Sequence, residues 1–223
     1  NYKESVFVVG NIGNPYTAAA LEMREDSVAV AEMSSFQLET IHEFRPKVSA
    51  ILNITPDHLN RHHTMDCYIK TKEAITTNQT KDEVCVLNYE DEVLRAFGES
   101  APVHVVWFSS ARKLAEGFYL DGEEIFYAHD GNTEKVINVN DLNLLGRHNY
   151  ENVMAATAMS VNFGVPMEKI VEVLKRFQAV EHRIEYVTEK RGVRFYNDSK
   201  GTNPDAAIQG IRAMNRPTLL IGG

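Results

Sequence analysis

The chain has 223 residues, 43% of them hydrophobic and 24% charged, with a formal net charge of −8 at pH 7. This composition is ordinary for a folded soluble protein. The acidic balance and the lack of a Lys/Arg cluster argue against a nucleic-acid binder. Two cysteines, Cys67 and Cys85, are too few for a disulfide framework. No apolar run reaches the roughly 18 residues of a membrane helix, and no signal peptide opens the chain. We therefore expect a cytoplasmic protein, without a membrane partner, and take a monomer as the default.

The first half of the chain alternates short apolar runs with helical patterns. Strands are expected at residues 5–10, 27–33, 48–54, 83–87 and 103–108. Helices are expected at residues 16–24, 65–78 and 91–97. The run at 5–10, which ends in glycine, is typical of a buried parallel strand. This alternation predicts an α/β fold, with a mostly parallel sheet flanked by helices on both faces.

In the second half of the chain, turn residues between short apolar runs interrupt the alternation of strands and helices. Asp-Gly at 121–122 and Asp-Gly-Asn at 130–132 predict antiparallel hairpins within residues 118–139. Helices are expected at 149–162, 167–177 and 204–214, and a hairpin at 184–197 around Arg191-Gly192. The last run, 218–223, has the pattern of another strand. Because functional loops of α/β proteins follow strands, and the chain stops at one, we expect a segment of a longer protein.

Two polar clusters follow the first two predicted strands. Gly10-Asn11-Ile12-Gly13 would let the backbone approach an anionic ligand at a helix start, although a tight turn is the simpler interpretation of that motif alone. Glu32 follows an apolar run, where a carboxylate suits a metal ligand or a catalytic acid. Alternatively, Glu32 is an edge carboxylate beside a helix that Ser34 or Ser35 caps.

A third cluster follows the next predicted strand. It contains Asp57-His58, with His62 and His63 close behind. We find neither a helical His-x-x-x-His pair nor a Cys-x-x-Cys pair, which argues against zinc. A solvated loop with idle histidines is the alternative. Downstream, Tyr68 and Lys72 are four residues apart and share a helix face, from which Lys70 points away. Lys72 could equally be an ordinary surface lysine.

The fourth cluster is split along the chain. Asn149 and Asn152 are neighbours at a helix start, after Gly146-Arg147-His148. Residues 181–183 read Glu-His-Arg. Residues 197–204, between a strand and a helix, offer Lys, Thr, Asn and backbone N–H groups that can hold anions. An ordinary capped helix start would explain the last segment as well.

Together these strings resemble the Mur ligases, the ATP-dependent amide-forming enzymes of peptidoglycan synthesis. The matching strings keep the family's order along essentially the whole chain. They are Glu32-x-Ser34-Ser35-Phe36-Gln37-Leu38, Asp57-His58, Tyr68-x-x-x-Lys72, Gly146-x-His148-Asn149, His182-Arg183 and Asn197-Asp198-Ser199-Lys200-x-Thr202-Asn203. The first string looks like that of the branch that adds D-glutamate to UDP-N-acetylmuramoyl-L-alanine.

The resemblance implies a P-loop-type central ATP-binding domain over residues 1–179, incomplete because the P-loop would lie upstream. Residues 180–223 would begin a Rossmann-like C-terminal domain. No Gly-x-x-Gly-Lys-Thr/Ser string occurs in the chain. We therefore expect this segment alone to bind ATP poorly and not to catalyse.

The resemblance also implies roles for individual residues. Glu32, His58 and Lys72, the last as a carbamate, would hold catalytic Mg²⁺. Three residues would contact the muramoyl substrate: Asn11, Ser34 and Gln37. Five would bind ATP: Asn149, Asn152 at adenine, His182 near the base, Arg183 at the γ-phosphate and Asp198 at the ribose. Lys200 and Thr202 would position D-glutamate or the reacting carboxylate.

Three alternatives remain open at this point. Another Mur-type ligase would add a different amino acid. A non-catalytic nucleotide-binding paralogue would keep the fold but have no need for Glu32, His58 and Lys72. A metal-dependent hydrolase would use Glu32, Asp57, His58 and His63 and would bind metal without nucleotide.

Overall fold

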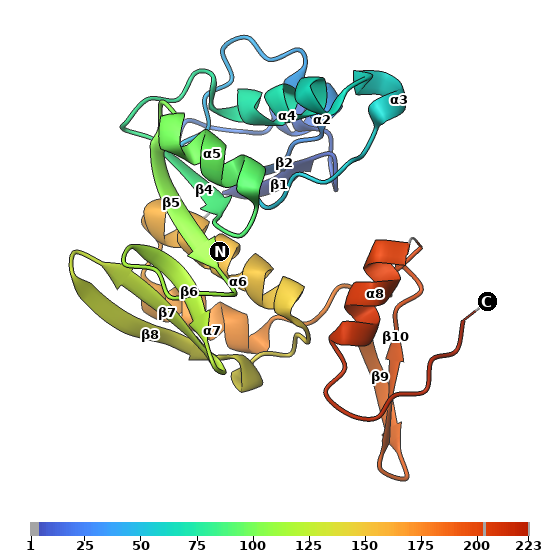
Figure 1. Ribbon diagram of the computed structural model, residues 1–223. Helices are drawn as coiled ribbons and strands as arrows, with labels where there is room; N and C mark the ends of the chain where they lie inside the picture. Colours follow the sequence, from blue (N-terminus) through green and yellow to red (C-terminus); the bar gives the residue numbers. More distant parts are fainter. Residues whose placement is uncertain (1–4, 203, 223) are drawn as a thin grey trace.

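The largest element of the computed structural model is a six-stranded sheet (Figure 1). The structure describes residues 5–202 and 204–222. The strand order follows the chain: β3 (Val48–Ile51), β4 (Val84–Asn88), β5 (His104–Ser109), β6 (Gly117–Asp121), β7 (Glu124–His129) and β8 (Asn132–Asn138). Strands β3 to β6 are parallel to one another, whereas β6, β7 and β8 form an antiparallel meander. The predicted α/β fold and the hairpins within 118–139 are confirmed.

Helices cover both faces of this sheet. Because side chains alternate along a strand, Leu87 and Val86 face opposite sides. Leu87 packs with α4 (Met65–Glu73), which the short 3₁₀ helix η1 (Ala74–Thr76) continues, and with α5 (Glu92–Ser100). Val86 packs with α6 (Arg147–Asn162) and α7 (Met167–Arg176). A 3₁₀ turn, η2 (Val139–Asp141), follows β8.

A separate two-stranded parallel sheet pairs β1 (Val6–Gly10) with β2 (Val28–Glu32). Both strands were expected from the sequence, but the burial predicted for the run at 5–10 is reached only at Val9, which is fully buried. Val8 is 59% exposed and Val30 52% exposed. In the part of the chain that the structure describes, these two strands pair with no other strand. An apolar run therefore sets the strand, whereas burial depends on what covers it.

Three helices near this small sheet are single turns: α1 (Tyr16–Ala19), α2 (Ser35–Leu38) and α3 (Leu59–His62). The helix expected over 16–24 ends after one turn, and residues 20–22 form a turn. Four residues are too few to show helical periodicity, so α3 was not expected, and α2 was expected only in the alternative in which Ser34 or Ser35 caps a helix.

The remaining elements are a hairpin and one helix. Strand β9 (Glu185–Lys190) pairs antiparallel with β10 (Val193–Asn197), and α8 (Pro204–Arg212) follows. Arg191 (φ 53°) and Gly192 (φ 78°) form the tight turn that the sequence predicted. The strand expected at 218–223 is wrong for 218–222, because that segment pairs with no other described strand. Gly223, like Asn203 of the fourth cluster, lies outside the described residues.

Figure 1 shows the hairpin and α8 lying to one side of the larger sheet, next to the start of α6. The start of α6 and the end of α8 approach each other closely. A Cβ at Gly146, just before α6, would come within 2.6 Å of the Ala213 Cβ at the end of α8. None of the helices within the described ranges is long and apolar enough to cross a membrane.

Candidate functional site

The first cluster is built where β1 and β2 end side by side. Gly10 pairs with Glu32, and the Asn11 backbone N–H donates to the Glu32 carbonyl oxygen at 2.8 Å. The Asn11 side-chain amide donates to Glu32 Oε1, also at 2.8 Å. Gly10 has φ 110°, and a Cβ there would lie 2.2 Å from the Glu32 carbonyl oxygen. The glycine is therefore required by close approach of two backbones, and the turn holds Asn11 against the Glu32 carboxylate.

Ser34 and Gln37 form a capping box at the start of α2. The Gln37 backbone N–H donates to Ser34 Oγ at 3.3 Å, and the Ser34 backbone N–H donates to Gln37 Oε1 at 2.9 Å. The capping alternative considered for this segment is thus confirmed for Ser34. Both side chains are partly buried beside the exposed Glu32 carboxylate.

His58 lies next to this helix through an aromatic contact. The Phe36 and His58 rings are 4.9 Å apart between centroids, and His58 has a left-handed backbone (φ 52°) just before α3. His58 and His62 do stand four residues apart, but His58 precedes the helix, so they do not form a helical metal-binding pair. Asp57 Oδ2 lies 3.4 Å from His58 Nε2.

His62 differs from the idle loop histidine that the sequence suggested. Its side chain is buried, with Nε2 3.0 Å from Ser35 Oγ and Nδ1 3.4 Å from Glu39 Oε1. Its ring also stacks with Phe36 at 5.8 Å. His62 therefore joins α3 to α2, whereas His63 is exposed. In the sequence, only the nearness of His62 to Asp57-His58 indicated that His62 could belong to the site.

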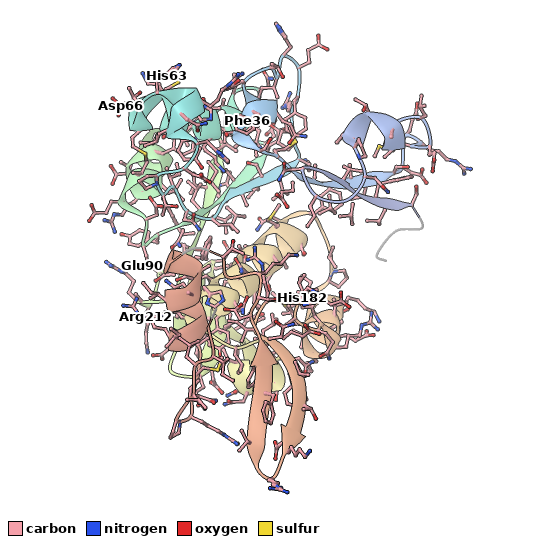
Figure 2. The ribbon with its side chains drawn as sticks, turned by 90° about the vertical axis from the view of Figure 1, so that its right-hand side faces the viewer. Phe36, His63, Asp66, Glu90, His182 and Arg212 are labelled. Atoms are coloured by element: carbon pink, nitrogen blue, oxygen red, sulfur yellow. The ribbon has the colours of Figure 1, made fainter. Side chains whose placement is uncertain are left out.

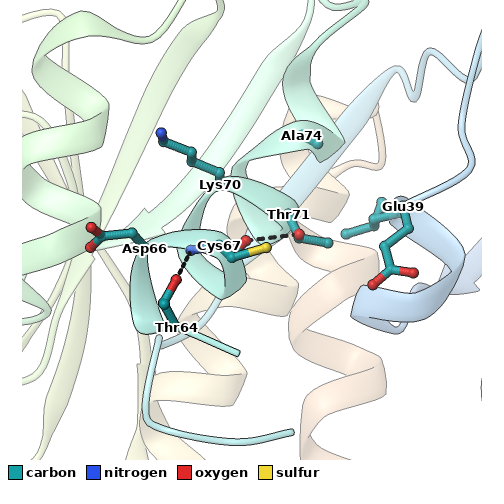
Figure 3. A pocket seen from close by; sticks show the side chains of 8 residues that line it. Glu39, Thr64, Asp66, Cys67, Lys70, Thr71 and Ala74 are labelled. Atoms are coloured by element: carbon teal, nitrogen blue, oxygen red, sulfur yellow. Dashed lines mark hydrogen bonds between the residues drawn. The ribbon is translucent and has the colours of Figure 1, made fainter. Parts of the chain in front are cut away.

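Lys72 and Tyr68 lie on one face of α4, as predicted. Lys72 Nζ stands 5.6 Å from the centre of the Tyr68 ring. Burial, and secondarily the charge of Asp57, raises the pKa of Tyr68. Lys70, unlike Lys72, lines a cavity of about 570 Å³ between α2 and α4, with Glu39, Asp66 and Cys67 (Figure 3). The two lysines thus serve different surfaces of one helix.

No group of three or more His, Cys, Asp and Glu side chains able to hold a metal occurs within residues 5–202 and 204–222. The hydrolase alternative, with Glu32, Asp57, His58 and His63 as ligands, gains no support. Any metal at Glu32 and His58 would need ligands beyond these side chains.

The second group of predicted residues lies around the start of α6. The Asn149 side chain donates to the Leu145 carbonyl oxygen at 2.7 Å, securing the turn before the helix. His148 is half-buried, and burial lowers its pKa, with Arg183 acting in the same direction and Glu151 and Asp198 opposing. Arg183 and Asp198 belong to the hairpin segment. Residues about 35 to 50 positions apart therefore meet electrostatically at His148.

The hairpin segment is held by its own bonds. His182 Nδ1 lies 2.9 Å from Asn197 Nδ2, and the Lys200 backbone N–H donates to the His182 carbonyl oxygen at 3.0 Å. Asp198 Oδ1 accepts from the Ile184 N–H at 3.1 Å. A Cβ at Gly210 would lie 2.3 Å from Asp198 Oδ2, so α8 packs directly on this carboxylate.

The other members of this group are open to solvent. Arg183, Lys200 and Thr202 are exposed. Asn152 is exposed too and lines an apolar cavity of about 780 Å³ between α6 and α7. Figure 2 shows Phe36, beside the first group, in one half of the molecule and His182, in the second, in the other half. The structure thus gathers the predicted residues into two groups, one in each half.

The residues that fix the loops between these groups were not expected from the sequence. Asp91 Oδ2 accepts from the Ile54 N–H at 2.7 Å, while its Oδ1 caps α5 through Val93 and Leu94. Asp91 thereby ties the loop that leads to His58 to the end of β4. An Asp directly before a helical run indicates a helix cap, so the cap bonds of Asp91 could have been predicted. The bond from the Ile54 N–H could not, because it depends on β3 and β4 being neighbours in the sheet.

Glu90, the preceding residue, binds the end of β5. It accepts from Ser109 Oγ at 2.6 Å and from the Arg112 guanidinium at 2.9 and 2.8 Å. Burial alone would raise the pKa of Glu90, but the bonds from Arg112 and Ser109 outweigh it and hold the pKa below its usual value. An ionised carboxylate therefore joins two strand ends at the edge of the sheet where ligands of α/β proteins bind.

Comparison with known proteins gives one consistent result. Residues 6–160 match the family model described as the Mur ligase middle domain. The chain is 62% identical over 222 residues to the UDP-N-acetylmuramoylalanine–D-glutamate ligase of Lachnospira eligens, covering all of this chain and 49% of that protein. It is 48% identical over 221 residues to the enzyme of the same name from Clostridioides difficile, covering 99% of this chain and 49% of that protein.

Solved structures agree at the level of fold. The crystal structure of MurF ligase from Thermotoga maritima in complex with ADP matches with a TM-score of 0.67 and 19% identity, over 95% of this chain and 51% of that one. MurC from the same organism matches with a TM-score of 0.62 and 19% identity, over 95% of this chain and 54% of that one. The chain spans about half the length of the curated relatives it matches, and it belongs to the Mur ligase family.

Proposed function

We propose that this chain is part of an ATP-dependent ligase that adds D-glutamate to UDP-N-acetylmuramoyl-L-alanine in peptidoglycan synthesis. The observation that carries the proposal is the 62% identity over the whole chain to a relative of that name. The geometry supports it through two polar groups, one at the ends of β1 and β2 and one at the start of α6. Such a division suits a reaction in which ATP, bound by one group, phosphorylates the carboxylate of an acceptor substrate bound by the other.

In the proposed reaction, ATP phosphorylates the terminal carboxylate of the muramoyl substrate, which gives an acyl phosphate and ADP. The D-glutamate amine attacks the acyl carbon, and the tetrahedral intermediate collapses to the amide and releases phosphate. Arg183, whose guanidinium is exposed, would pair with the γ-phosphate. Asn149, Asn152, His182 and Asp198 would bind the rest of the nucleotide.

The residues near β1 and β2 would hold the acceptor. Asn11, Ser34 and Gln37 would contact the muramoyl substrate, and the capping bonds of Ser34 and Gln37 fix their orientation. Lys200 and Thr202, both exposed, would position D-glutamate or the reacting carboxylate. These assignments rest on the motif strings and on the accessibility of the side chains.

Magnesium is compatible with the donors near Glu32. Mg²⁺ prefers oxygen ligands, keeps several waters, and is often bound by one or two protein groups and substrate phosphates. The exposed Glu32 carboxylate fits that preference, and His58 is exposed as well. Bound Mg²⁺ would neutralise charge on the phosphates. Lys72, partly buried on Tyr68, would contribute as a carbamate, which is an anion like a carboxylate.

We also propose a boundary between residues 179 and 180. The last helix packed on the large sheet, α7, ends at Arg176, and the hairpin begins with Glu185. The first unit would carry the ATP-binding fold and the second would begin a C-terminal domain. Closure of the two would bring Arg183 and Lys200 toward the acceptor group.

Phosphate release by the full-length protein tests this function. The assay contains ATP, Mg²⁺, UDP-N-acetylmuramoyl-L-alanine and a panel of amino acids. We expect turnover with D-glutamate alone. Lys72→Ala should lower the turnover rate at least about 100-fold. Lys70→Ala should leave turnover near normal, because the Lys70 side chain lines the cavity between α2 and α4 and lies away from Tyr68.

Two other outcomes of this assay would contradict the proposed specificity or the proposed activity. Turnover with a different amino acid would identify another Mur-type ligase. No turnover with any amino acid would contradict the ligase proposal and favour a non-catalytic paralogue.

A further inference from the structure

Ser110, the first residue after β5, is bound by two side chains of α6. The Ser110 hydroxyl donates to Glu151 Oε1, and Arg147 Nη2 donates to the Ser110 carbonyl oxygen. Ser110 is only 3% exposed. Because Arg147 and Glu151 are four residues apart, they lie on one face of the helix. The first turns of α6 are thus fixed to the sheet through a single residue.

That residue is itself firmly held. Its neighbour Ser109 is fully buried, donates to Glu90 and accepts the backbone N–H groups of Ala111 and Arg112 at 3.2 and 3.0 Å. Two N–H groups of Arg112 close the loop onto the same Glu90 carboxylate. Ser110 therefore offers α6 an anchor whose position is set by β4 and β5.

The anchored turns carry residues assigned above to the nucleotide. Asn149 and Asn152 alternate with Arg147 and Glu151 along the first turns of α6. Successive residues of a helix point about 100° apart, so a small rotation of α6 would redirect both amides. The bonds to Ser110 resist that rotation from the opposite side of the turn.

We propose that Ser110 and Glu151 are positioning residues for the nucleotide, which they would orient through α6 without touching it. The inference rests on the proposed function, because it presumes that Asn149 and Asn152 meet ATP. It assigns a role to two residues that the family motifs do not include.

Calorimetric binding of ADP to the full-length protein tests the proposal. We expect Ser110→Ala to weaken ADP binding about fivefold, since one hydrogen bond to a carboxylate is lost. Ser110→Thr keeps the hydroxyl and should restore most of the affinity. The KM for ATP should rise in parallel, while the KM for D-glutamate stays unchanged. A general loss of structure would not produce that split.

Ser100→Ala is the matched control. The Ser100 hydroxyl is exposed and donates to the Phe97 carbonyl oxygen at the end of α5, so its removal should leave ADP affinity unchanged. If Ser110→Ala does not fold, Glu151→Gln keeps the shape of the acceptor while removing its charge. We expect about threefold weaker ADP binding for that variant.

The outcomes separate the two proposals. Wild-type ADP affinity in a folded Ser110→Ala or Glu151→Gln protein would overturn the positioning role and leave the ligase function intact. Failure of the unsubstituted full-length protein to bind ADP would overturn both.

Discussion

The six-stranded sheet and the two small sheets are made of similar residues but differ in burial. Val86 of β4 and Phe108 of β5 are fully buried, whereas Val8 of β1 is 59% exposed and Phe195 of β10 is 47% exposed. The large sheet has helices on both faces, and each small sheet has two strands. Apolar strands thus contribute to a core only where other elements cover them, and we expect substitutions in the two kinds of sheet to differ in cost.

A matched pair of phenylalanine substitutions should give the largest contrast. Phe108→Ala removes a fully buried ring and leaves a cavity, so we expect the free energy of unfolding to fall by about 4 kcal/mol. Phe195→Ala removes a ring that is already half in solvent, so we expect a loss below about 1 kcal/mol. Urea denaturation of both variants measures the difference. Equal losses would mean that the β9–β10 sheet is buried in solution.

Asp91 tests whether the loops at the edge of the large sheet are fixed as firmly as its strands. Asp91→Ala removes the cap of α5 and leaves the buried Ile54 N–H without its acceptor. We expect a loss of about 2 kcal/mol in the free energy of unfolding. Asp82→Ala, at an exposed position, is the control and should cost less than about 0.5 kcal/mol. Similar values for both variants would show that the Ile54 bond contributes nothing.

The smallest effect on stability is expected from His148, which lies at the start of α6 and interacts electrostatically with Arg183 and Asp198 of the hairpin segment. Burial lowers its pKa below 6.5, Arg183 adds to this, and Glu151 and Asp198 oppose it. The unfolded chain therefore binds more protons between the folded pKa and 6.5, so native stability falls as the pH drops through that interval.

Urea midpoints at about pH 7.5 and about pH 5.5 measure this dependence. We expect a smaller decrease in His148→Gln than in the unsubstituted protein. An unchanged decrease would assign the pH dependence to other groups.

Much of the fold follows from sequence pattern. Apolar periodicity predicted β1 to β5, and the turn residues predicted the meander and the β9–β10 hairpin. The pattern failed where covering elements or pairing decide the outcome, as for the exposed Val8 of β1 and the unpaired segment 218–222.

In the candidate site too, some features could be predicted from the sequence and others depend on the fold. Family strings identified Glu32, His58 and Lys72 as candidates, and local spacing correctly put Lys72 on the face of Tyr68. The bonds of Asp91 to Ile54 and of Ser110 to Glu151 join residues 37 and 41 positions apart. They depend on which strand ends are neighbours, and no local pattern contains that information.

Trp107 of β5 gives the molecule an optical reporter. It is the only tryptophan of the chain, so all indole emission comes from one position. Its ring meets Tyr89 edge-on at 5.3 Å, and Gly98 of α5 leaves room for it, since a Cβ there would lie 2.4 Å from the indole. Tyr89 directly precedes Glu90 and Asp91. Fluorescence of the native chain therefore reads out, without a label, the state of the strand ends on which both polar groups depend.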